Sequence, residues 1–224
     1  MSINVAIDGP AGAGKSTIAK RVAKEKGYIY VDTGAMYRAM ALHFIRQGIG
    51  ADEEEKINDA CKNADISITY EDGVQVVILN GENVNGFLRT EQVGNMASAT
   101  SVFGEVRKKL VELQQKLAAK ENVVMDGRDI GTVVLPNAEV KIYLTASSAV
   151  RAKRRFLELQ EKGENADIDR IEKDIIERDH RDMTREISPL KQADDAILVD
   201  SSDMTIDEVV DKIMTIINAA EQAK

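Results

Sequence analysis

The sequence predicts an α/β protein in which a parallel five-stranded sheet is covered by helices on both faces. Two observations predict this fold. Short apolar runs alternate with longer segments of helical periodicity along most of the chain, as in proteins whose parallel strands are buried. The first apolar run also ends in a glycine-rich turn that opens a helix. A length of 224 residues suits one such core with insertions.

The individual elements follow from the same patterns. We expect the five strands at residues 4–7, 28–31, 122–125, 140–144 and 196–199. We expect helices at residues 16–26, 33–46, 53–63, 103–120, 147–162, 168–186 and 205–220. The segment 63–90 breaks this alternation, because Ile66, Ile68 and Tyr70 alternate with polar residues before a Glu-Asp-Gly turn and a second extended run. We therefore expect a small antiparallel hairpin inserted in the parallel fold.

Composition limits the partners that the protein can have. A net charge of -8 and a pI of about 5.0 make it a poor candidate for non-specific binding to nucleic acid. We find no apolar run near the roughly 20 residues of a membrane helix and no signal-peptide pattern. A single cysteine, Cys61, favours a cytoplasmic location. We expect a monomer, and we interpret His43 and His180 as structural, since neither has metal-ligand neighbours at useful spacing.

The glycine-rich turn carries a phosphate-binding motif. Residues 9–16 match G-x-x-x-x-G-K-[ST] after a strand and before a helix, which is the context that the motif requires. The backbone N–H groups can turn toward a polyphosphate, Lys15 can reach the β- and γ-phosphates, and Ser16 can hold Mg²⁺. The residues predicted to bind a nucleoside triphosphate are Gly9, Pro10, Ala11, Gly12, Ala13, Gly14, Lys15, Ser16 and Thr17. The sequence has no Asn-Lys-x-Asp motif for reading guanine, which argues against a GTPase.

Charged residues also follow the second and third predicted strands. Thr33 and Arg38 come after the second strand, and Asp126, Arg128 and Asp129 end the third. Because the carboxyl ends of parallel strands face one crevice, we expect these side chains near the group that accepts phosphate. A lone Asp at a strand end is often a turn residue, but this cluster beside a phosphate loop favours a functional role. Asp126 would then lie near Mg²⁺ and contact it through water.

Two charged helices repeat arginine at helical spacing. The arginines are Arg151, Arg154 and Arg155 on the first helix and Arg178, Arg181 and Arg185 on the second. Such a pattern is usually a solvated face laced with ion pairs. A site that transfers phosphoryl groups, however, needs guanidinium groups around the transferring group, so some of these arginines are candidates for a closing lid. The sequence leaves both interpretations open.

Together, these motifs resemble the cytidylate kinases of bacteria, within the nucleoside monophosphate kinase superfamily. The matching stretches are IDGPAGAGKST, DTGAMYR, LRTEQVGNMAS, VVMDGRDIGTVV, RAKRR and ERDHRDMTREISPL. They run essentially from end to end, and DTGAMYR and DGRDIGTVV are specific to this family. The resemblance implies a three-layer P-loop kinase core that uses Mg²⁺ and ATP to phosphorylate CMP and dCMP.

The resemblance also implies roles for residues at matching positions. Including Thr33, placed by its position, the residues expected to bind CMP are Thr33, Arg38, Ser98, Arg107, Arg128, Asp129, Arg178, Asp182 and Arg185. The phosphate would be bound by Arg38, Arg128 and Arg185. The cytosine would be recognised by Ser98, Arg107 and Asp129, and the pentose would be contacted by Arg178 and Asp182. The residues expected to act in catalysis are Lys15, Arg128, Arg151, Arg155 and Arg185.

Three parts of the chain are implied as well. The core would comprise residues 1–34, 122–155 and 188–224. A domain for the nucleoside monophosphate would comprise residues 35–121, with the insertion at about 63–90, and a short helical lid would comprise residues 156–187. Ser16 stands where some family members carry glycine, and its hydroxyl should favour Mg²⁺ binding.

Two alternatives remain at this point. The first is a kinase for UMP or another small acceptor, which the base-reading residues Ser98, Arg107 and Asp129 would discriminate. The second is a nucleotide-binding regulatory protein that has lost its chemistry. Loss of Lys15, of Asp126 or of the arginine set would be its expected sign, and all of them are present.

Overall fold

The central sheet has the strand order β2-β6-β1-β7-β8, and all of its pairings are parallel. The computed structural model describes residues 3–223. The strands are β1 (Asn4–Asp8), β2 (Ile29–Asp32), β6 (Val123–Gly127), β7 (Val140–Thr145) and β8 (Ile197–Asp200). The predicted parallel five-stranded sheet is therefore confirmed, and the strands begin and end within about two residues of their expected bounds.

Strand β1 lies at the centre of the sheet and is buried on both faces. Val5 and Ile7 pack into the apolar cluster on one face, and Ala6 packs into the cluster on the other. β1 pairs with β6 on one side and with β7 on the other, so the strand order reverses at this point. In open parallel sheets, ligands bind beyond the carboxyl ends of the strands at such a reversal.

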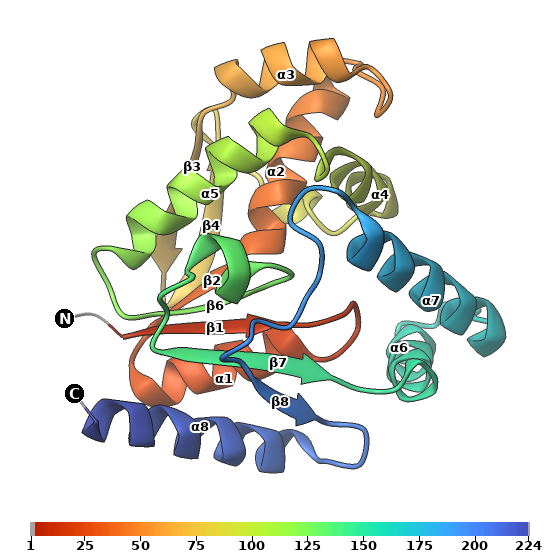
Figure 1. Ribbon diagram of the computed structural model, residues 1–224. Coiled ribbons are helices and arrows are strands. Elements are labelled where there is room, and N and C mark those ends of the chain that lie inside the picture. Colours follow the sequence, from red (N-terminus) through yellow and green to blue (C-terminus); the bar gives the residue numbers. More distant parts are fainter. Residues whose placement is uncertain (1–2, 224) are drawn as a thin grey trace.

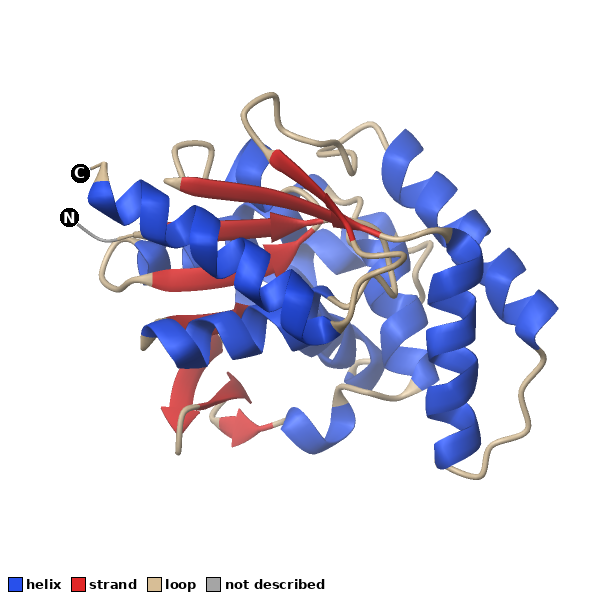
Figure 2. Cartoon of the chain, turned by 90° about the horizontal axis from the view of Figure 1, so that it is seen from below, coloured by secondary structure: helices blue, strands red, loops and turns tan. Residues whose placement is uncertain are grey.

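Helices cover both faces of this sheet (Figure 1; Figure 2). α1 (Lys15–Lys26) and α8 (Ile206–Gln222) lie side by side on one face, and α8 begins with a capping box formed by Thr205 and Glu208. α2 (Thr33–Arg46) and α5 (Gly104–Ala118) contribute to the apolar cluster on the other face. α6 (Ser148–Glu161) and α7 (Ile168–Thr184) pack against each other beyond the carboxyl end of β7.

The expected hairpin lies between α2 and α5 in the chain. It follows α3 (Glu54–Asn63) and forms an antiparallel sheet of β3 (Ile66–Glu71), β4 (Val74–Leu79) and β5 (Glu82–Asn83). Gln75 accepts a hydrogen bond from the backbone N–H of Asp32 at 2.8 Å and donates to its carbonyl at 3.2 Å. The hairpin therefore holds the carboxyl end of β2, where the acceptor-side residues begin.

Four elements escape the sequence patterns, among them the two-residue strand β5, which lies in an expected loop. α4 (Glu91–Thr100) was not predicted because Gly94 and Ser98 weaken its helical signal; Thr90 caps it by accepting from the N–H of Val93. η1 (Asn85–Phe87) is a single short turn in an expected loop. η2 (Ile130–Val134) is a π-helix, in which the N–H of Leu135 bonds to the carbonyl of Ile130. Its five residues are too few to show a helical period.

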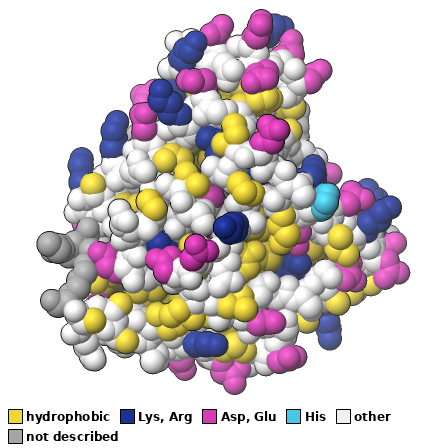
Figure 3. All heavy atoms as spheres, in the orientation of Figure 1, with side chains coloured by type: hydrophobic (Ala, Val, Ile, Leu, Met, Phe, Trp, Pro, Cys, Tyr) yellow, Lys and Arg dark blue, Asp and Glu magenta, His cyan; other side chains and the backbone are white. Residues whose placement is uncertain are grey.

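Exposed charges of both signs are mixed on the surface. Figure 3 shows acidic and basic side chains interspersed over one face of the molecule, including the region of α3 and α5. That face offers no continuous basic patch of the kind that nucleic-acid binding requires. None of the helices between residues 3 and 223 is long and apolar enough to cross a membrane.

A substitution at Gly9 tests how closely the phosphate loop packs against the sheet. Gly9 has a φ of 151°, and an added Cβ would lie 1.9 Å from the carbonyl oxygen of Leu144. We expect Gly9→Ala to lower the free energy of unfolding by about 3 kcal/mol, because backbone atoms of β7 must move. The measurement is urea denaturation. Gly27→Ala is the control, since nothing lies within 4 Å of its added Cβ and only its φ of 68° is strained; a loss of about 1 kcal/mol is expected there. Equal losses would contradict the account.

Candidate active site

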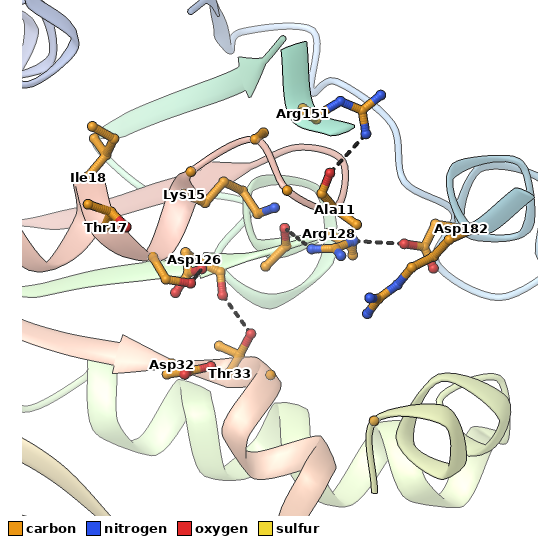
Figure 4. Close-up of a pocket in the computed structure, with 18 of the residues that line it drawn as sticks. Ala11, Lys15, Thr17, Ile18, Asp32, Thr33, Asp126, Arg128, Arg151 and Asp182 are labelled. Carbon is orange, nitrogen blue, oxygen red and sulfur yellow. Dashed lines mark hydrogen bonds and ion pairs between the residues drawn. The ribbon is translucent and has the colours of Figure 1, made fainter. Parts of the chain in front are cut away.

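A pocket of about 860 Å³ opens at the carboxyl edge of the central sheet (Figure 4). Its lining includes Ala11, Gly12, Ala13, Gly14, Lys15, Ser16 and Thr17 of the phosphate loop. It also includes Thr33, Arg38, Ser98, Arg107, Asp126, Arg128, Asp129, Arg151, Arg155, Arg178, Asp182 and Arg185. Gly9 and Pro10 do not line the pocket. Gly9 packs closely against Leu144 of β7, and the carbonyl of Pro10 accepts a hydrogen bond from Lys15. The structure therefore brings the donor-side and acceptor-side candidates together.

The phosphate loop presents free backbone N–H groups to this pocket. Gly14 is the N-cap of α1 with a φ of 85°, and it has no side chain to bond the first-turn N–H groups. The first intrahelical bond runs from the N–H of Ile18 to the carbonyl of Gly14. The N–H groups of Lys15, Ser16 and Thr17 thus have no intrahelical acceptor, and the helix end carries partial positive charge. Such an end is suited to an anion.

Lys15 is buried at the base of the pocket. Its Nζ donates to the carbonyl of Pro10 at 2.7 Å, and 6% of the residue is exposed. Burial lowers the pKa of Lys15 to about 7, with a further contribution from the positive charge of Arg128, while Asp126 and Asp8 oppose the shift. A bound polyphosphate would add negative charge beside the ammonium group and raise this pKa again.

Asp126, at the end of β6, lies at the centre of a small hydrogen-bond network. Its Oδ2 accepts from the Ser16 hydroxyl at 2.8 Å and its Oδ1 from the Tyr30 hydroxyl at 2.8 Å. The Thr33 hydroxyl donates to its backbone carbonyl at 2.7 Å. Burial raises the pKa of Asp126, and the nearby Asp32 adds to the shift, so an ionised Asp126 favours a cation beside it.

The oxygen atoms of Ser16 and Asp126 suit a magnesium ion that also binds phosphate and water, rather than a metal ion held by protein side chains alone. Within residues 3–223, no three His, Cys, Asp or Glu side chains gather as a ligand set. Mg²⁺ is commonly held by one or two protein oxygens together with phosphates and water. Ser16 and Asp126, adjacent to the phosphate loop, supply that number of protein groups.

The acceptor side holds arginine donors that are only partly paired. Arg38 lies 3.2 Å from Asp32, but its buried Nε has no hydrogen-bond partner among the described residues. The Nη2 of Arg185 is also buried without a hydrogen bond, 3.8 Å from Asp129. Arg128 donates to Asp182 at 2.8 Å. Because unpaired buried donors cost free energy, an anion bound between these groups would be stabilised.

A buried ion pair lies deeper on the acceptor side. Arg107 of α5 donates through Nη2 to Asp129, and both side chains are almost fully buried. Nη1 of Arg107 also donates to the carbonyl of Ser101 at 3.3 Å, and the guanidinium lies over the ring of Tyr37. Ser98 of α4 also lines the pocket. The pair thus presents one donor group and one acceptor group in a fixed orientation.

The arginines of α6 and α7 do not form a single class. Arg151 is buried, donates to the carbonyl of Ala11 at 2.8 Å, and pairs with Asp179 at 2.6 Å. Arg155 is exposed and pairs with Glu158. Arg178 and Arg185 line the pocket, whereas Arg181 does not. Part of this pattern is therefore a solvated face and part belongs to the pocket.

Several residues of the site were not predicted from the sequence. Asp179 accepts from the N–H of Ala11 at 3.3 Å, so α7 contacts the phosphate loop directly, but its only signal was one Asp among many on a charged helix. Tyr30 lay in an apolar strand run. The loop after β8 and the start of α8 also line the pocket without any motif, through Ser201, Met204, Thr205, Ile206 and Val209.

The pocket concentrates positive charge in an acidic protein. Its lining holds nine arginines and Lys15 against five acidic side chains, although the whole chain has a net charge of -8. Such a local excess attracts phosphorylated ligands in particular.

Two solved structures have the same overall fold at low sequence identity. An uncharacterised protein from Eubacterium ventriosum is 15% identical with a TM-score of 0.53, covering 98% of this chain and 99% of that one. A gluconokinase from Sinorhizobium meliloti is 14% identical with a TM-score of 0.50, covering 99% of this chain and 95% of that one. These similarities concern the fold alone.

Sequence relatives are much closer. The chain is 54% identical to a cytidylate kinase of Caldicellulosiruptor saccharolyticus over 212 residues, which cover 95% of this chain and 94% of that protein. It is 52% identical to a cytidylate kinase of Lactobacillus johnsonii over 220 residues, which cover 98% and 96%. Residues 5–219 match the family model described as cytidylate kinase. The resemblance inferred from the motifs is thus confirmed, and the chain belongs to the cytidylate kinase family.

Proposed function

We propose that the protein transfers the γ-phosphoryl group of ATP to CMP and dCMP, producing ADP and CDP or dCDP. One observation carries the proposal: the phosphate loop shares a pocket with Arg38, Arg128 and the buried pair of Arg107 and Asp129. Membership of a family of kinases and close relatives named cytidylate kinase support it. A regulatory protein without chemistry is less well supported, since the residues expected to act on ATP are retained.

On the donor side, the loop N–H groups and Lys15 would hold the phosphates of ATP. Mg²⁺, held by Ser16 directly and by Asp126 through water, would neutralise charge on the β- and γ-phosphates. The hydrogen bond from Tyr30 would keep the carboxylate of Asp126 oriented toward Ser16.

On the acceptor side, the phosphate of CMP would lie between Arg38, Arg128 and Arg185. One of its oxygens attacks the γ-phosphorus while the bond from that phosphorus to the bridging oxygen of ADP breaks. A phosphate dianion is already a nucleophile, so the site needs to orient it and stabilise charge rather than remove a proton. Arg151 and Arg155, on α6, would meet charge that develops on the transferring group.

Base choice would rest on Ser98, Arg107 and Asp129. Cytosine offers an amino donor and an N3 acceptor, so Asp129 or Ser98 can accept from the amino group while Arg107 donates to N3. Uracil has an acceptor where cytosine has its amino donor, and a donor at N3. It would therefore leave buried groups of the protein unpaired, at a cost of about 1–3 kcal/mol for each group. Such a mismatch supports rejection of UMP by this pocket. Arg178 and Asp182 would contact the pentose.

The proposal includes a movement of the chain. Residues 1–34, 122–155 and 188–224 would form a core, residues 35–121 a domain for the monophosphate, and residues 156–187 a lid that excludes water as it closes. Because α7 already contacts the phosphate loop through Asp179, closure would not require a new docking surface. We further propose a cytoplasmic monomer, a location compatible with its one free thiol, Cys61.

Turnover on a panel of monophosphates tests the reaction. ADP should form in a coupled assay only when an acceptor is added, and CMP and dCMP should be turned over faster than UMP or AMP. Lys15→Ala should lower kcat at least about a hundredfold while the protein stays folded, because a charge at the transferring phosphate is lost. Lys24→Ala, an exposed lysine on the same helix, is the control. Fastest turnover of UMP or AMP, or a Lys15→Ala variant as active as the control, would refute the assignment.

The lowered pKa of Lys15 predicts proton uptake when ATP binds. At pH 8 a lysine with a pKa of about 7 is mostly neutral in the free protein, and bound phosphates favour its charged form. Titration calorimetry of Mg-ATP at pH 8, in two buffers of different ionisation enthalpy, should show uptake of up to about one proton. The uptake should disappear in Lys15→Arg, whose guanidinium remains charged. Identical binding enthalpies in both buffers for the unmodified protein would contradict the assignment.

A further inference from the structure

Asp8 is a buried carboxylate that takes no part in the proposed chemistry. It is the last residue of β1, directly before the phosphate loop, and 5% of it is exposed. It does not line the pocket. Burial raises its pKa to about 6, although hydrogen bonds from two backbone N–H groups oppose this shift. Burying a carboxylate costs free energy compared with burying an apolar side chain, so the hydrogen bonds of Asp8 must offset that cost.

Those contacts tie β1 to the start of the π-helix η2. Oδ1 of Asp8 accepts from the N–H of Ile130 at 2.8 Å, and Oδ2 accepts from the N–H of Gly131 at 2.7 Å. The first N–H groups of a helix have no intrahelical acceptor, and a negative charge at that end is favourable. Asp8 therefore caps η2 from a strand more than a hundred residues away in the chain.

The capped backbone directly follows two residues of the acceptor side. Asp129 is the N-cap of η2, and Arg128 precedes it. Asp129 pairs with Arg107, and Arg128 pairs with Asp182. Both residues directly precede the backbone amides of Ile130 and Gly131 that Asp8 binds. A small displacement of the η2 amides would therefore move the groups expected to read the base and hold the phosphate.

The contact has little room to adapt. A Cβ added to Gly131 would lie 3.3 Å from Oδ2 of Asp8 and 3.2 Å from Cδ of Lys141. Both separations are tighter than ordinary van der Waals contact, so a side chain at residue 131 would push against the carboxylate. Glycine at this position keeps the two hydrogen bonds short.

We infer that Asp8 is a positioning residue for base discrimination: it fixes Asp129 and Arg128 relative to the phosphate loop by holding the amides of Ile130 and Gly131. The inference rests on the proposed function and adds to it a residue that acts without touching either nucleotide. The carboxylate of Asp8 would thus fix the position of the acceptor side of the pocket relative to its donor side. Its loss should affect CMP more than ATP.

The test is Asp8→Asn. An amide offers one acceptor oxygen and turns its NH₂ group toward the second backbone N–H, so one hydrogen bond is lost while the size is kept. We expect KM for CMP to rise about tenfold and the preference for CMP over UMP to fall about tenfold, the effect of one unpaired buried group. KM for ATP should change by less than about threefold, because the loop N–H groups stay in place and Asp8 opposes the lowering of the Lys15 pKa less than Asp126, which is retained. Hydrogen exchange in residues 129–135 should accelerate about tenfold.

Ile217→Ala is the control for general destabilisation. Ile217 is fully buried in α8, outside the pocket lining, so this variant should lose stability and keep its preference for CMP. An Asp8→Asn variant with unchanged KM for CMP and unchanged base preference would overturn the inference. So would one whose preference falls no further than that of Ile217→Ala, or one in which KM for ATP rises as much as KM for CMP.

A second variant covers the case in which Asp8→Asn does not fold. Gly131→Ala disturbs the same contact from the opposite side and should give the same pattern, a raised KM for CMP with weaker base preference. Gly131→Ala with the kinetics of the unmodified protein would then overturn the inference. If the unmodified protein does not phosphorylate CMP, the proposed function fails instead, and hydrogen exchange at η2 still measures the contact.

Discussion

The structure depends on positive charge that is buried at the carboxyl edge of β1 and only partly paired. The pKa of Lys15 falls to about 7 there, and buried donor nitrogens of Arg38 and Arg185 have no hydrogen-bond partner within residues 3–223. Each feature costs free energy in the free protein. The negative charge of bound phosphates would offset that cost, so the same groups that destabilise the free protein favour two phosphorylated ligands in one pocket.

The rest of the fold supplies the rigidity that this arrangement requires. One apolar cluster joins α1 and α8 to one face of the sheet, and another joins α2, α5 and the inserted hairpin to the other. Hydrogen bonds then extend from these clusters to the edge of the sheet: Gln75 holds Asp32, Tyr30 holds Asp126, and Asp8 holds η2. The ends of β2 and β6 are therefore held by the side chains of Gln75 and Tyr30, and the end of β1 is held through the bonds of Asp8 to the backbone of η2, so charged groups of like sign can be kept close together.

Local sequence patterns predicted what is encoded locally. The strands and most helices followed from periodicity, and the phosphate loop followed from a motif in its required context, because each depends on neighbouring residues alone. The π-helix and α4 were missed: the first is short and capped from β1, and the second contains residues with low helix propensity. The roles of Asp8 and Asp179 were likewise invisible, since Asp8 resembles any strand-end turn residue and Asp179 any charge on a solvated helix. Their partners lie 122 and 168 residues away.

The most direct test of the account is a crystal structure with CMP and a non-hydrolysable ATP analogue bound together. We expect the CMP phosphate between Arg38, Arg128 and Arg185, with its nearest oxygen about 3–3.5 Å from the γ-phosphorus and in line with the bond that breaks. CMP bound outside this pocket, or held in it with its phosphate pointing away from Lys15 and the γ-phosphate, would contradict the claim that one pocket unites donor and acceptor.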